Sequence, residues 1–500
     1  MRALTVAALG ALIAAPVLAH GTHGGLARQY QNAPTAGALP TPGRAWLPGD
    51  HHIHSEFSAD YEPDPASPQT APIPLLGKDG RYAIVKNAQM ARQFGLRWMV
   101  STDHGGPNHS KLNYEQAWPA VNSARAAVPE MLIFYGMEFD TPAGDHSSLI
   151  IPFTGDEREQ LRAIESGFSK REPWPRDEAL VKLGDSEGRM IDALKLMRDQ
   201  KAPPVLIANH PSRSATAPSA WGQYTPAEFC NWNDTAPRVA IGMEGAPGHQ
   251  AGAIKPDGSP DPTGNRGGYG RAPTLGGFDQ MTSVLGGFWD SMLAEGRRWF
   301  ITATSDSHAN WRDGGNDFWP GEYSKTYVQA RTEHADIIDG LRSGRIFVTT
   351  GDLVSEVDVI ASSGRASAGI GGTLAVAKGR AVDVTIRVRD PAAANAAGRT
   401  PGVARIDIIT GPITSAAVDR TTDRAPGTAV AQRFTAADWR REGEVITIHW
   451  RIPAVTGPLN LRVRGTSTAE MEPGADPKGE DPWSDLWFYA NPIFVTVKGK

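Results

Sequence analysis

Cysteine is almost absent from this sequence, which contains only Cys230 among 500 residues. A single thiol excludes an intramolecular disulfide, and it excludes a metal cage built from several thiolates. Any metal ion bound by this chain must therefore be held by nitrogen and oxygen ligands. In an oxidising compartment, a lone cysteine is most simply a small, buried apolar residue.

Long runs of like charge and long apolar runs are scarce as well. No run of five or more like charges occurs, and the formal net charge is -5 at pH 7. Because a nucleic-acid-binding surface needs clustered Lys and Arg, this balance argues against such a surface. Beyond the N-terminus, no segment is apolar enough to anchor the chain in a membrane.

The N-terminal residues have the pattern of an export signal. Arg2 supplies a positive charge, Ala3–Ala15 is a short apolar stretch, and Ala19 ends a run of small residues. We therefore predict a cleavable signal peptide over residues 1–19 and a secreted or periplasmic protein. Residues 20–46 are rich in Ala, Gly, Pro and Thr and are predicted to form an extended arm.

Residues 47–350 alternate short apolar strands with helical stretches. Strands are predicted at 97–101, 131–137, 147–151, 205–208, 239–243 and 299–304. Helical periodicity occurs at 82–94, 189–198 and 332–342. This alternation predicts an α/β fold with a parallel sheet, closed or distorted into a barrel.

Residues 211–287 interrupt this alternation. They are rich in Gly, Pro and Trp, and we predict a long loop insertion here. Long loops at one end of a barrel often shape the substrate pocket. The alternative is an excursion that packs on its own aromatic side chains, and the sequence supports both interpretations equally.

The C-terminal residues 351–500 nearly lack helical periodicity. Apolar and polar residues alternate at 381–389, 403–410, 444–451, 459–464 and 493–497. Period-two strands at this spacing predict an antiparallel β-sandwich. Because 500 residues exceed the size of one compact core, we expect this region to be a second domain.

Histidines mark the ends of the predicted strands. His52 and His54 are two residues apart, so on a strand both imidazoles point to one face, which suits chelation of one ion. Alone, this pair is weak support for a metal site. However, six of the 13 histidines lie at strand ends: His52, His54, His104, His146, His210 and His308. Catalytic groups of α/β barrels lie at the C-terminal ends of the strands.

The same order of motifs resembles the polymerase and histidinol phosphatase (PHP) superfamily. The matching elements are His52-x-His54 with Asp60, Asp103-His104, Glu138, His146, His210-Pro211 and Asp306-x-His308. The resemblance covers about residues 47–350. It implies a distorted (β/α)7 barrel with up to three divalent metal ions, either Zn, Mn or Fe, at the strand ends.

The resemblance also implies how the ions are held. The first ion would be bound by His52, His54, Glu138 and Asp306. Glu138 would bridge to a second ion at His146 and His210. The third ion would be bound by Asp60, His104 and His308. Asp50 and Asp103 fit the role of accepting ring N–H bonds that fix ligand tautomers, with strand-end capping as the alternative.

Charge then indicates the substrate. Three divalent ions and three carboxylates leave a net positive charge of about three, which favours an anionic substrate such as a small phosphate ester. Water that bridges two such ions loses a proton near neutral pH, and the resulting hydroxide can attack phosphorus in line. Export and the aromatic, glycine-rich insertion favour hydrolysis of small organophosphate diesters.

Three further residues are candidates for catalytic roles. Arg213 follows His210-Pro211 and is a candidate to clamp a phosphate oxygen, or else it forms a surface salt bridge. His51 and His109 lie next to the motifs and are candidates to protonate the leaving group, or else they are neighbours that face solvent.

Other functions fit the same residues. The alternatives are hydrolysis of phosphate monoesters, hydrolysis of carboxyl or carbamate esters, and a non-catalytic metal- or carbohydrate-binding surface protein. Nine ligands in order favour an enzyme, because a purely structural zinc site closes on four. A homo-oligomer is compatible with the sequence.

Overall fold

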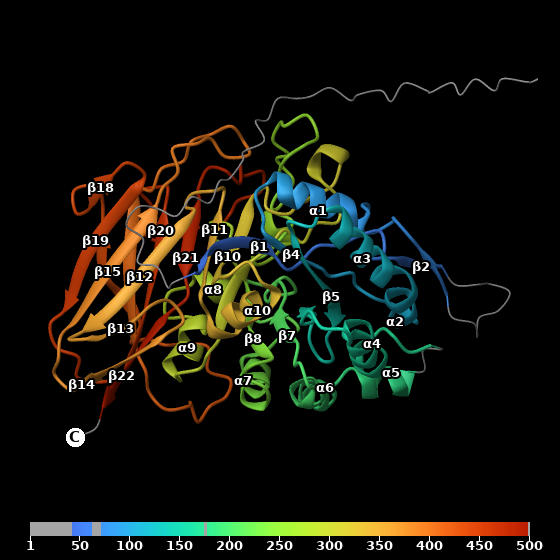
Figure 1. The fold of residues 1–500 in the computed structure, drawn as a ribbon, viewed down its shortest axis with the longest axis horizontal. Coiled ribbons are helices and arrows are strands. Elements are labelled where there is room, and N and C mark those ends of the chain that lie inside the picture. Colours follow the sequence, from blue (N-terminus) through green and yellow to red (C-terminus); the bar gives the residue numbers. More distant parts are fainter. Residues whose placement is uncertain (1–42, 63–71, 175–177, 499–500) are drawn as a thin grey trace, which may run out of the picture.

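The computed structural model describes residues 43–62, 72–174 and 178–498. The predicted export signal and most of the predicted arm lie outside these ranges. The first strand, β1 (Ala45–Asp50), begins two residues inside the predicted arm. Figure 1 shows two parts side by side, a helix-rich α/β part and a strand-rich part made by the C-terminal third.

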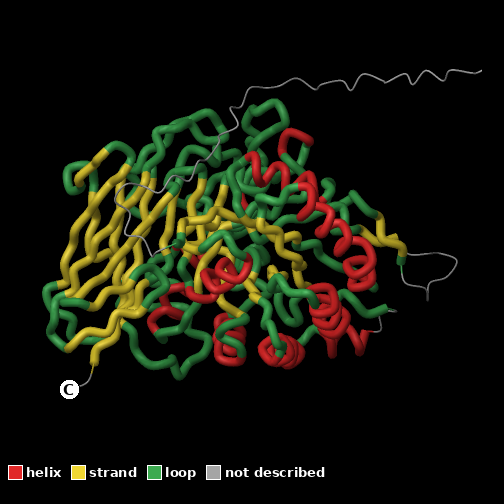
Figure 2. Tube along the Cα trace, in the orientation of Figure 1, coloured by secondary structure: helices red, strands yellow, loops and turns green. Residues whose placement is uncertain are grey.

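The α/β part is a sheet with helices around it, and Figure 2 shows that the helices gather in this part. Its sheet contains, in order, β1, β4 (Trp98–Ser101), β5 (Leu132–Asp140), β6 (His146–Ile150), β7 (Val205–Ala208), β8 (Ala240–Ala246) and β9 (Phe300–Ala303). Its α-helices are α1 (Ile84–Gln93), α2 (His109–Leu112), α3 (Trp118–Ala127), α4 (Glu157–Phe168), α5 (Glu178–Gly184), α6 (Glu187–Asp199), α7 (Pro226–Thr235), α8 (Gln280–Ser283), α9 (Phe288–Ala294) and α10 (His334–Ser343).

Helix α1 illustrates how the sequence pattern produces an element. Ile84, Ala88 and Ala91 recur at helical spacing and are buried, so they form the face that packs on the core. The chain leaves the helix through Gly95, whose φ of 85° is the left-handed conformation that ends many helices. Among the described residues, no helix is long and apolar enough to cross a membrane.

Strand β6 departs from the predicted parallel sheet. It runs antiparallel to both β5 and β7, whereas β1–β4–β5 and β7–β8–β9 are parallel. Only residues 141–145 join β5 to β6, which is too short for a crossover helix, so the two strands form a hairpin. Because β6 is reversed, His146 at its start lies at the same edge as the C-terminal ends of its neighbours.

The sheet order ends at β9. In the described part of the chain no ladder joins β9 to β1, so a closed barrel is not found and the distorted (β/α)7 barrel stays a prediction. The segments that follow the two strands are nevertheless linked. Ile53 and Ser307 form an isolated parallel bridge, and the Ser305 N–H donates to Asp50 at 3.0 Å.

At its other end the sheet continues into the C-terminal third. Beyond β1, in order, it contains β10 (Ser324–Ala330), β11 (Ile346–Thr350), β21 (Trp487–Ala490), β20 (Leu459–Thr466), β22 (Ile493–Lys498) and β14 (Thr373–Ala377). Strand β20 also pairs with β16 (Arg405–Pro412), which pairs with β17 (Ala429–Phe434). The two parts of the molecule therefore share one continuous sheet of 15 strands.

A second sheet covers this extension. It contains, in order, β13 (Ala366–Ala368), β12 (Glu356–Ser363), β15 (Val382–Arg389), β19 (Val445–Ile452) and β18 (Arg440–Glu442). Ile386 of β15 and Leu461 of β20 are fully buried members of one apolar cluster between the two sheets. Trp46 and Tyr327 belong to the same cluster, so this core crosses the predicted domain boundary at residue 350.

A buried arginine joins the 211–287 insertion to the C-terminal third. The Arg266 guanidinium donates to Glu480 and Asp485, each at 2.8 Å, and to the Tyr323 hydroxyl at 2.9 Å. Asp476 accepts the backbone N–H bonds of Gly276 and Gly277. The insertion is thus held from outside by residues 476–485. It does not pack only on its own aromatic residues.

The Arg266 cluster should make stability depend on pH. Burial raises the pKa of Glu480 to about 7, from an ordinary value of 4.5, although Arg266 lowers it. A carboxyl whose folded pKa is raised stabilises the fold below its unfolded pKa and loses that contribution as pH rises through the folded value. Glu480→Gln stays neutral, so its Tm should match wild type at pH 5 and exceed it at pH 8, on the order of 1 °C.

The control for this measurement is Glu442→Gln, which changes an exposed side chain on β18. Its Tm difference from wild type should be the same at both pH values. A Glu480→Gln difference that also does not change with pH would show that burial of this carboxyl does not affect folding.

Candidate metal centre

Six strands bring polar side chains to one edge of the sheet. Strands β1, β4, β7 and β9 each end just before a histidine or carboxylate of the predicted set, and Glu138 lies within β5. Reversed strand β6 starts with His146 at the same edge. Most of these side chains are buried: Glu138, His210 and Asp306 expose no more than 2% of their surface.

His52 and His54 meet two carboxylates at the centre of this edge. The Nε2 atoms of the two rings lie 3.0 Å apart. The His52 Nε2 atom is 3.1 Å from both Glu138 Oε1 and Asp306 Oδ1, and the His54 Nε2 atom is 3.0 Å from Asp306 Oδ1. Ligand atoms of His52, His54 and Asp306 lie close enough together to hold one ion, and Glu138 lies beside them.

Glu138 also faces a second group. Its Oε1 atom lies 3.0 Å from His146 Nδ1 and 3.1 Å from His210 Nε2. The Glu138 carboxylate thus faces His52 as well as these two rings, and its bridging role between two ions stays a prediction.

Several of these atoms are buried without a well-directed hydrogen bond, although each lies within 4 Å of an oppositely charged group. Within the described ranges they include His146 Nδ1, His210 Nδ1, Asp306 Oδ1 and Asp79 Oδ2. A buried polar atom without a partner is costly and calls for an explanation. Convergent nitrogen and oxygen atoms of this kind fit divalent cations, so the residues present are able to bind metal ions.

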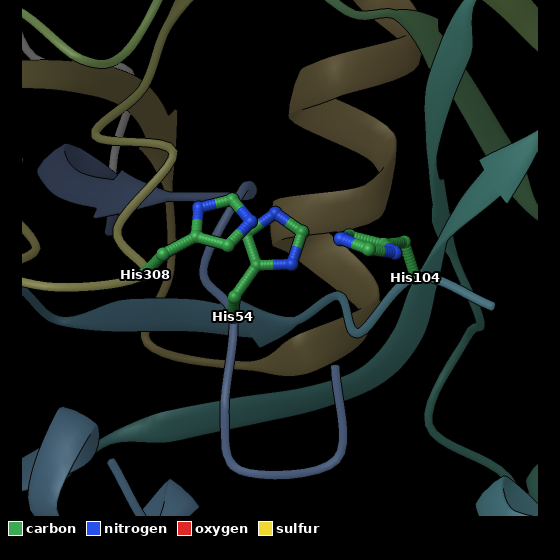
Figure 3. Close-up of side chains that lie close together, drawn as sticks. All are labelled: His54, His104 and His308. Carbon is green, nitrogen blue, oxygen red and sulfur yellow. The ribbon is translucent and has the colours of Figure 1, made fainter. Parts of the chain in front are cut away.

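The third group consists of His54, His104 and His308, and Figure 3 shows their rings close together on three separate segments. The His54 ring stacks on His308 with centroids 3.6 Å apart. Asp79 completes the group, since its Oδ2 atom is 2.5 Å from His104 Nε2 and 3.4 Å from His308 Nε2. Arg171 donates to the other nitrogen of His104 at 3.0 Å.

Asp60, the predicted carboxylate of this third group, is not brought to it. Asp60 is exposed on β2 (Asp60–Glu62), which pairs with β3 (Ile73–Leu75). Asp79 takes the expected place from a turn that follows β3. The sequence offered little to identify Asp79, because it lies in the turn Gly77-Lys78-Asp79-Gly80, away from any predicted strand end.

Glu244 orients the ligand rings. Its carboxylate accepts from His52 Nδ1 at 2.6 Å and from the His210 backbone N–H at 2.7 Å. The proton on His52 Nδ1 leaves its Nε2 free to face the ligand cluster.

The orienting role predicted for Asp50 and Asp103 is not seen. Asp50 accepts backbone N–H bonds of His52 and Ser305, which corresponds to the capping alternative. Asp103 accepts from the Ser55 backbone and from the Ser58 hydroxyl, and that hydroxyl lies 2.8 Å from His54 Nδ1. Neither carboxylate accepts from an imidazole ring directly, because backbone groups and hydroxyls occupy both.

His249 also belongs to the site, although no motif surrounds it in the sequence. Its Nε2 atom is 2.8 Å from Asp306 Oδ2, and its Nδ1 atom is 2.6 Å from Asp317 Oδ1. His249, Asp306 and His308 together form a further group able to bind a metal ion. Because His249 comes from the long insertion, only the folded chain brings it here.

Charge balance explains the protonation of the site. Burial alone would raise the pKa of Glu138 and Asp306, but the surrounding imidazoles hold both well below the usual range. Burial likewise lowers the pKa of His146, but the charges of Glu138 and Asp140 raise it to about 9. Ionised Glu138 thus faces a protonated His146, and metal binding would release that proton. Burial and the charge of His308 instead lower the pKa of His54.

The three candidate catalytic residues lie in different places. Arg213 is partly exposed beside the cluster, and its Nη2 atom is 3.2 Å from Asp145. His51 is fully buried against the Thr302 hydroxyl, and burial lowers its pKa to about 4. His109 is buried between Glu165 and the Phe57 carbonyl. Neither histidine faces the pocket, so the structure does not support either as the proton donor to a leaving group.

A cavity of about 430 Å³ opens onto the cluster. It is lined by Asp79, Arg81, His104, Glu138, His146, Arg213, His249, Asp306, His308, Ala309, Gly314, Gly315, Asn316 and Asp317. Arg81 and Arg213 place two guanidinium groups beside the imidazoles and carboxylates, an arrangement suited to an anionic ligand. Phe318 and Trp319, which follow Asp317, are buried and do not line the cavity.

Cys230 is buried, as predicted, with its Sγ atom 3.6 Å from Met292 Sδ. It lies on α7 and plays no part in the cluster.

No protein-family model and no curated protein matches this chain. Matched solved structures include a cellulose-active LPMO in complex with copper, at 9% identity over 26% of this chain and 54% of that chain, with a TM-score of 0.15. A chitin-binding domain from Burkholderia pseudomallei matches at 10% identity over 25% of this chain and 57% of that one, TM-score 0.15. A β-glucosidase from Listeria innocua in complex with gluconolactone matches at 12% identity over 54% of this chain and 38% of that chain, with a TM-score of 0.15.

This chain thus spans little more than half the length of the LPMO and chitin-binding chains, and 38% of the β-glucosidase. TM-scores of 0.15 are too low to indicate a common fold, so these likenesses carry no argument about fold or function.

The two aspartates near the third group provide a matched test. Asp79→Asn should weaken binding of one ion by at least about tenfold, because it removes a carboxylate that faces His104 and His308. Asp60→Asn should bind metal like wild type. Titration of metal-free protein with Zn²⁺ or Mn²⁺, followed by mass spectrometry of bound metal, measures both. The opposite ranking would restore Asp60 as the ligand.

Proposed function

We propose that this chain is a metal-dependent phosphoesterase of the PHP type that hydrolyses small phosphate diesters. The observation that carries the proposal is the overlap of the ligand groups at one cavity. Glu138 and Asp306 each face more than one imidazole group, so neighbouring ions would share a carboxylate. A purely structural site closes around one ion, whereas shared ligands beside an open cavity are typical of hydrolytic centres.

The proposed ligand sets follow the geometry. One ion is assigned to His52, His54, Glu138 and Asp306. A second is assigned to Glu138, His146 and His210, and a third to His104, His308 and Asp79. Nitrogen and carboxylate ligands accept Zn, Mn or Fe. Bound ions would act as Lewis acids and activate water for attack on phosphorus.

The side chains around the cavity have distinct tasks. Arg213 is positioned to bind a non-bridging phosphate oxygen, and Arg81 supplies a second guanidinium at the rim of the cavity. Glu244 holds His52 in the tautomer that keeps Nε2 free. The carboxylates near the ligands, including Glu244 and Asp317, reduce the positive charge expected of a loaded centre.

A diester is favoured over a monoester by charge and space. A diester carries one negative charge, which suits a centre whose positive charge is partly neutralised by these carboxylates. The cavity of about 430 Å³ has the size of a small-molecule site, so it has room for organic substituents on phosphorus. The insertion supplies Arg213 and His249 to its wall.

A serine nucleophile is disfavoured by local structure. Residues 184–188 have the spacing Gly-x-Ser-x-Gly, with Ser186 at the centre. However, Ser186 is the N-cap of α6, and its hydroxyl accepts the Arg189 N–H and donates to the Leu183 carbonyl. It follows helix α5 instead of a strand, so the strand–turn–helix setting of a nucleophile elbow is missing.

Hydrolysis of carboxyl or carbamate esters is the second candidate function, because the same ions would polarise a carbonyl oxygen. The two guanidiniums beside the cluster favour phosphate, since a neutral ester offers them no charge to bind. We further propose that the protein is exported, in line with its predicted signal peptide.

The assay that tests this function compares three substrates. Purified protein should hydrolyse bis-p-nitrophenyl phosphate faster than p-nitrophenyl phosphate, and p-nitrophenyl acetate slowest. Chelation should abolish turnover, and added Zn²⁺ or Mn²⁺ should restore it, with metal content measured by mass spectrometry. Turnover of the acetate alone would contradict the phosphoesterase proposal, and metal binding without any turnover would favour a binding protein.

Arg213 can be tested separately from the metal. Arg213→Ala should raise KM for a phosphate diester about tenfold, with a smaller change in kcat, because it removes a charge-assisted hydrogen bond. Arg331→Ala, a change at a half-exposed surface position, serves as the control and should leave both constants unchanged. An unchanged KM in Arg213→Ala would mean that this side chain only pairs with Asp145.

A further inference from the structure

His249 occupies a position between two buried carboxylates. Its Nδ1 atom lies 2.6 Å from Asp317 Oδ1 and its Nε2 atom 2.8 Å from Asp306 Oδ2. Asp317 also accepts the backbone N–H bonds of His308 and Ala309 at 2.6 and 2.8 Å. One carboxylate therefore fixes both His249 and the segment that carries His308.

The two carboxylate oxygens of Asp306 face different histidines. The Oδ1 atom is 3.1 Å from His52 Nε2 and 3.0 Å from His54 Nε2, whereas the Oδ2 atom faces His249. A carboxylate with ligand nitrogens at both oxygens has the geometry of a bridge between two cations. Asp306 therefore faces His249 in addition to His52 and His54. In the same way, Glu138 faces His146 and His210 in addition to His52.

The backbone around His249 is shaped to bring its ring here. His249 has a φ of 59°, in the left-handed region that non-glycine residues seldom adopt, and such strain gathers at functional sites. The preceding Gly248 packs so tightly that a Cβ atom would lie 2.0 Å from Asp306 Cβ. Only glycine lets the insertion approach Asp306 this closely.

We propose that His249 is an additional metal ligand, oriented by Asp317, and that Asp306 bridges the ion at His249 to the ion at His52 and His54. The assignment rests on the proposed metal centre. Asp317 accepts the Nδ1 proton of His249, which leaves Nε2 free, as in carboxylate–histidine–metal arrangements. His308, which is assigned to the third ion, lies next to His249 and Asp306. An imidazole and carboxylate set of this kind takes a borderline divalent cation such as Zn²⁺ or Mn²⁺.

The variant that tests this ligand is His249→Gly. Glycine adopts a φ of 59° without strain, so the change removes the imidazole and leaves the backbone conformation accessible. His249→Asn keeps a polar side chain that also tolerates the left-handed region. His449→Ala, at an exposed position on β19, is the matched control.

Metal binding is the readout, with Zn²⁺ and Mn²⁺ alone as probes. His249→Gly should lose one equivalent of bound metal or bind one ion at least about tenfold more weakly, and Asp317→Asn should show a smaller loss. Millimolar imidazole should restore binding in His249→Gly by refilling the space. In the Co²⁺-loaded protein, the visible absorption spectrum should change in His249→Gly and not in His449→Ala.

Unchanged stoichiometry, affinity and Co²⁺ spectrum in both His249 variants would overturn the proposal and leave His249 as an ion-pair partner of Asp306 and Asp317. Circular dichroism and Tm verify that each variant is folded, and His249→Asn decides the question if His249→Gly is not. Because the readout is metal binding, loss of the proposed phosphoesterase activity would leave this result standing. A wild-type chain that binds no metal would refute both the His249 assignment and the proposed metal-dependent function.

Discussion

The burial of carboxylates at one edge of the sheet is the constraint on which the rest of the site depends. Glu138, Glu244 and Asp306 expose at most 2% of their surface. An unpaired charge in such a place costs several kcal/mol, so each must meet cationic or hydrogen-bonding partners. The imidazoles that follow the strands supply these partners, and they make the same edge a binding place for cations. The need to pair these carboxylates accounts for the tautomer of His52, which donates to Glu244, and for the close approach of Gly248 and His249 to Asp306.

Much of the framework could be predicted from the sequence. Strand β7 occupies the predicted residues 205–208, and α1 lies within the predicted range 82–94. Period-two alternation likewise identified β15 and β19, because one face of each strand is buried. The ordered histidines were found for the same reason: a residue at the end of a buried strand has its position fixed by the strand.

What the sequence did not predict depends on contacts between distant segments. Asp79 and His249 lie outside helices and strands, where no periodicity indicates the direction of a side chain, so only the folded chain shows them beside the cluster. The resemblance implied Asp60 as a ligand of the third ion, but the β2–β3 hairpin keeps Asp60 exposed. The reversal of β6 follows from its short connection to β5. The sequence contains this short connection, but the alternation of strands and helices in the surrounding residues favoured a parallel strand.

The continuous sheet has a consequence for the order of folding. Strand β1 near the N-terminus pairs with β10, and β11 pairs with β21 close to the C-terminus. Pairings between residues so far apart in sequence form slowly, because a long loop must close before they give any stabilisation. The segments that carry His52 and His54 therefore reach their final positions only after nearly the whole chain has been synthesised. The side chains that could hold a metal ion are thus present early in the nascent chain, but they converge only late, at the same stage as the last strands pair.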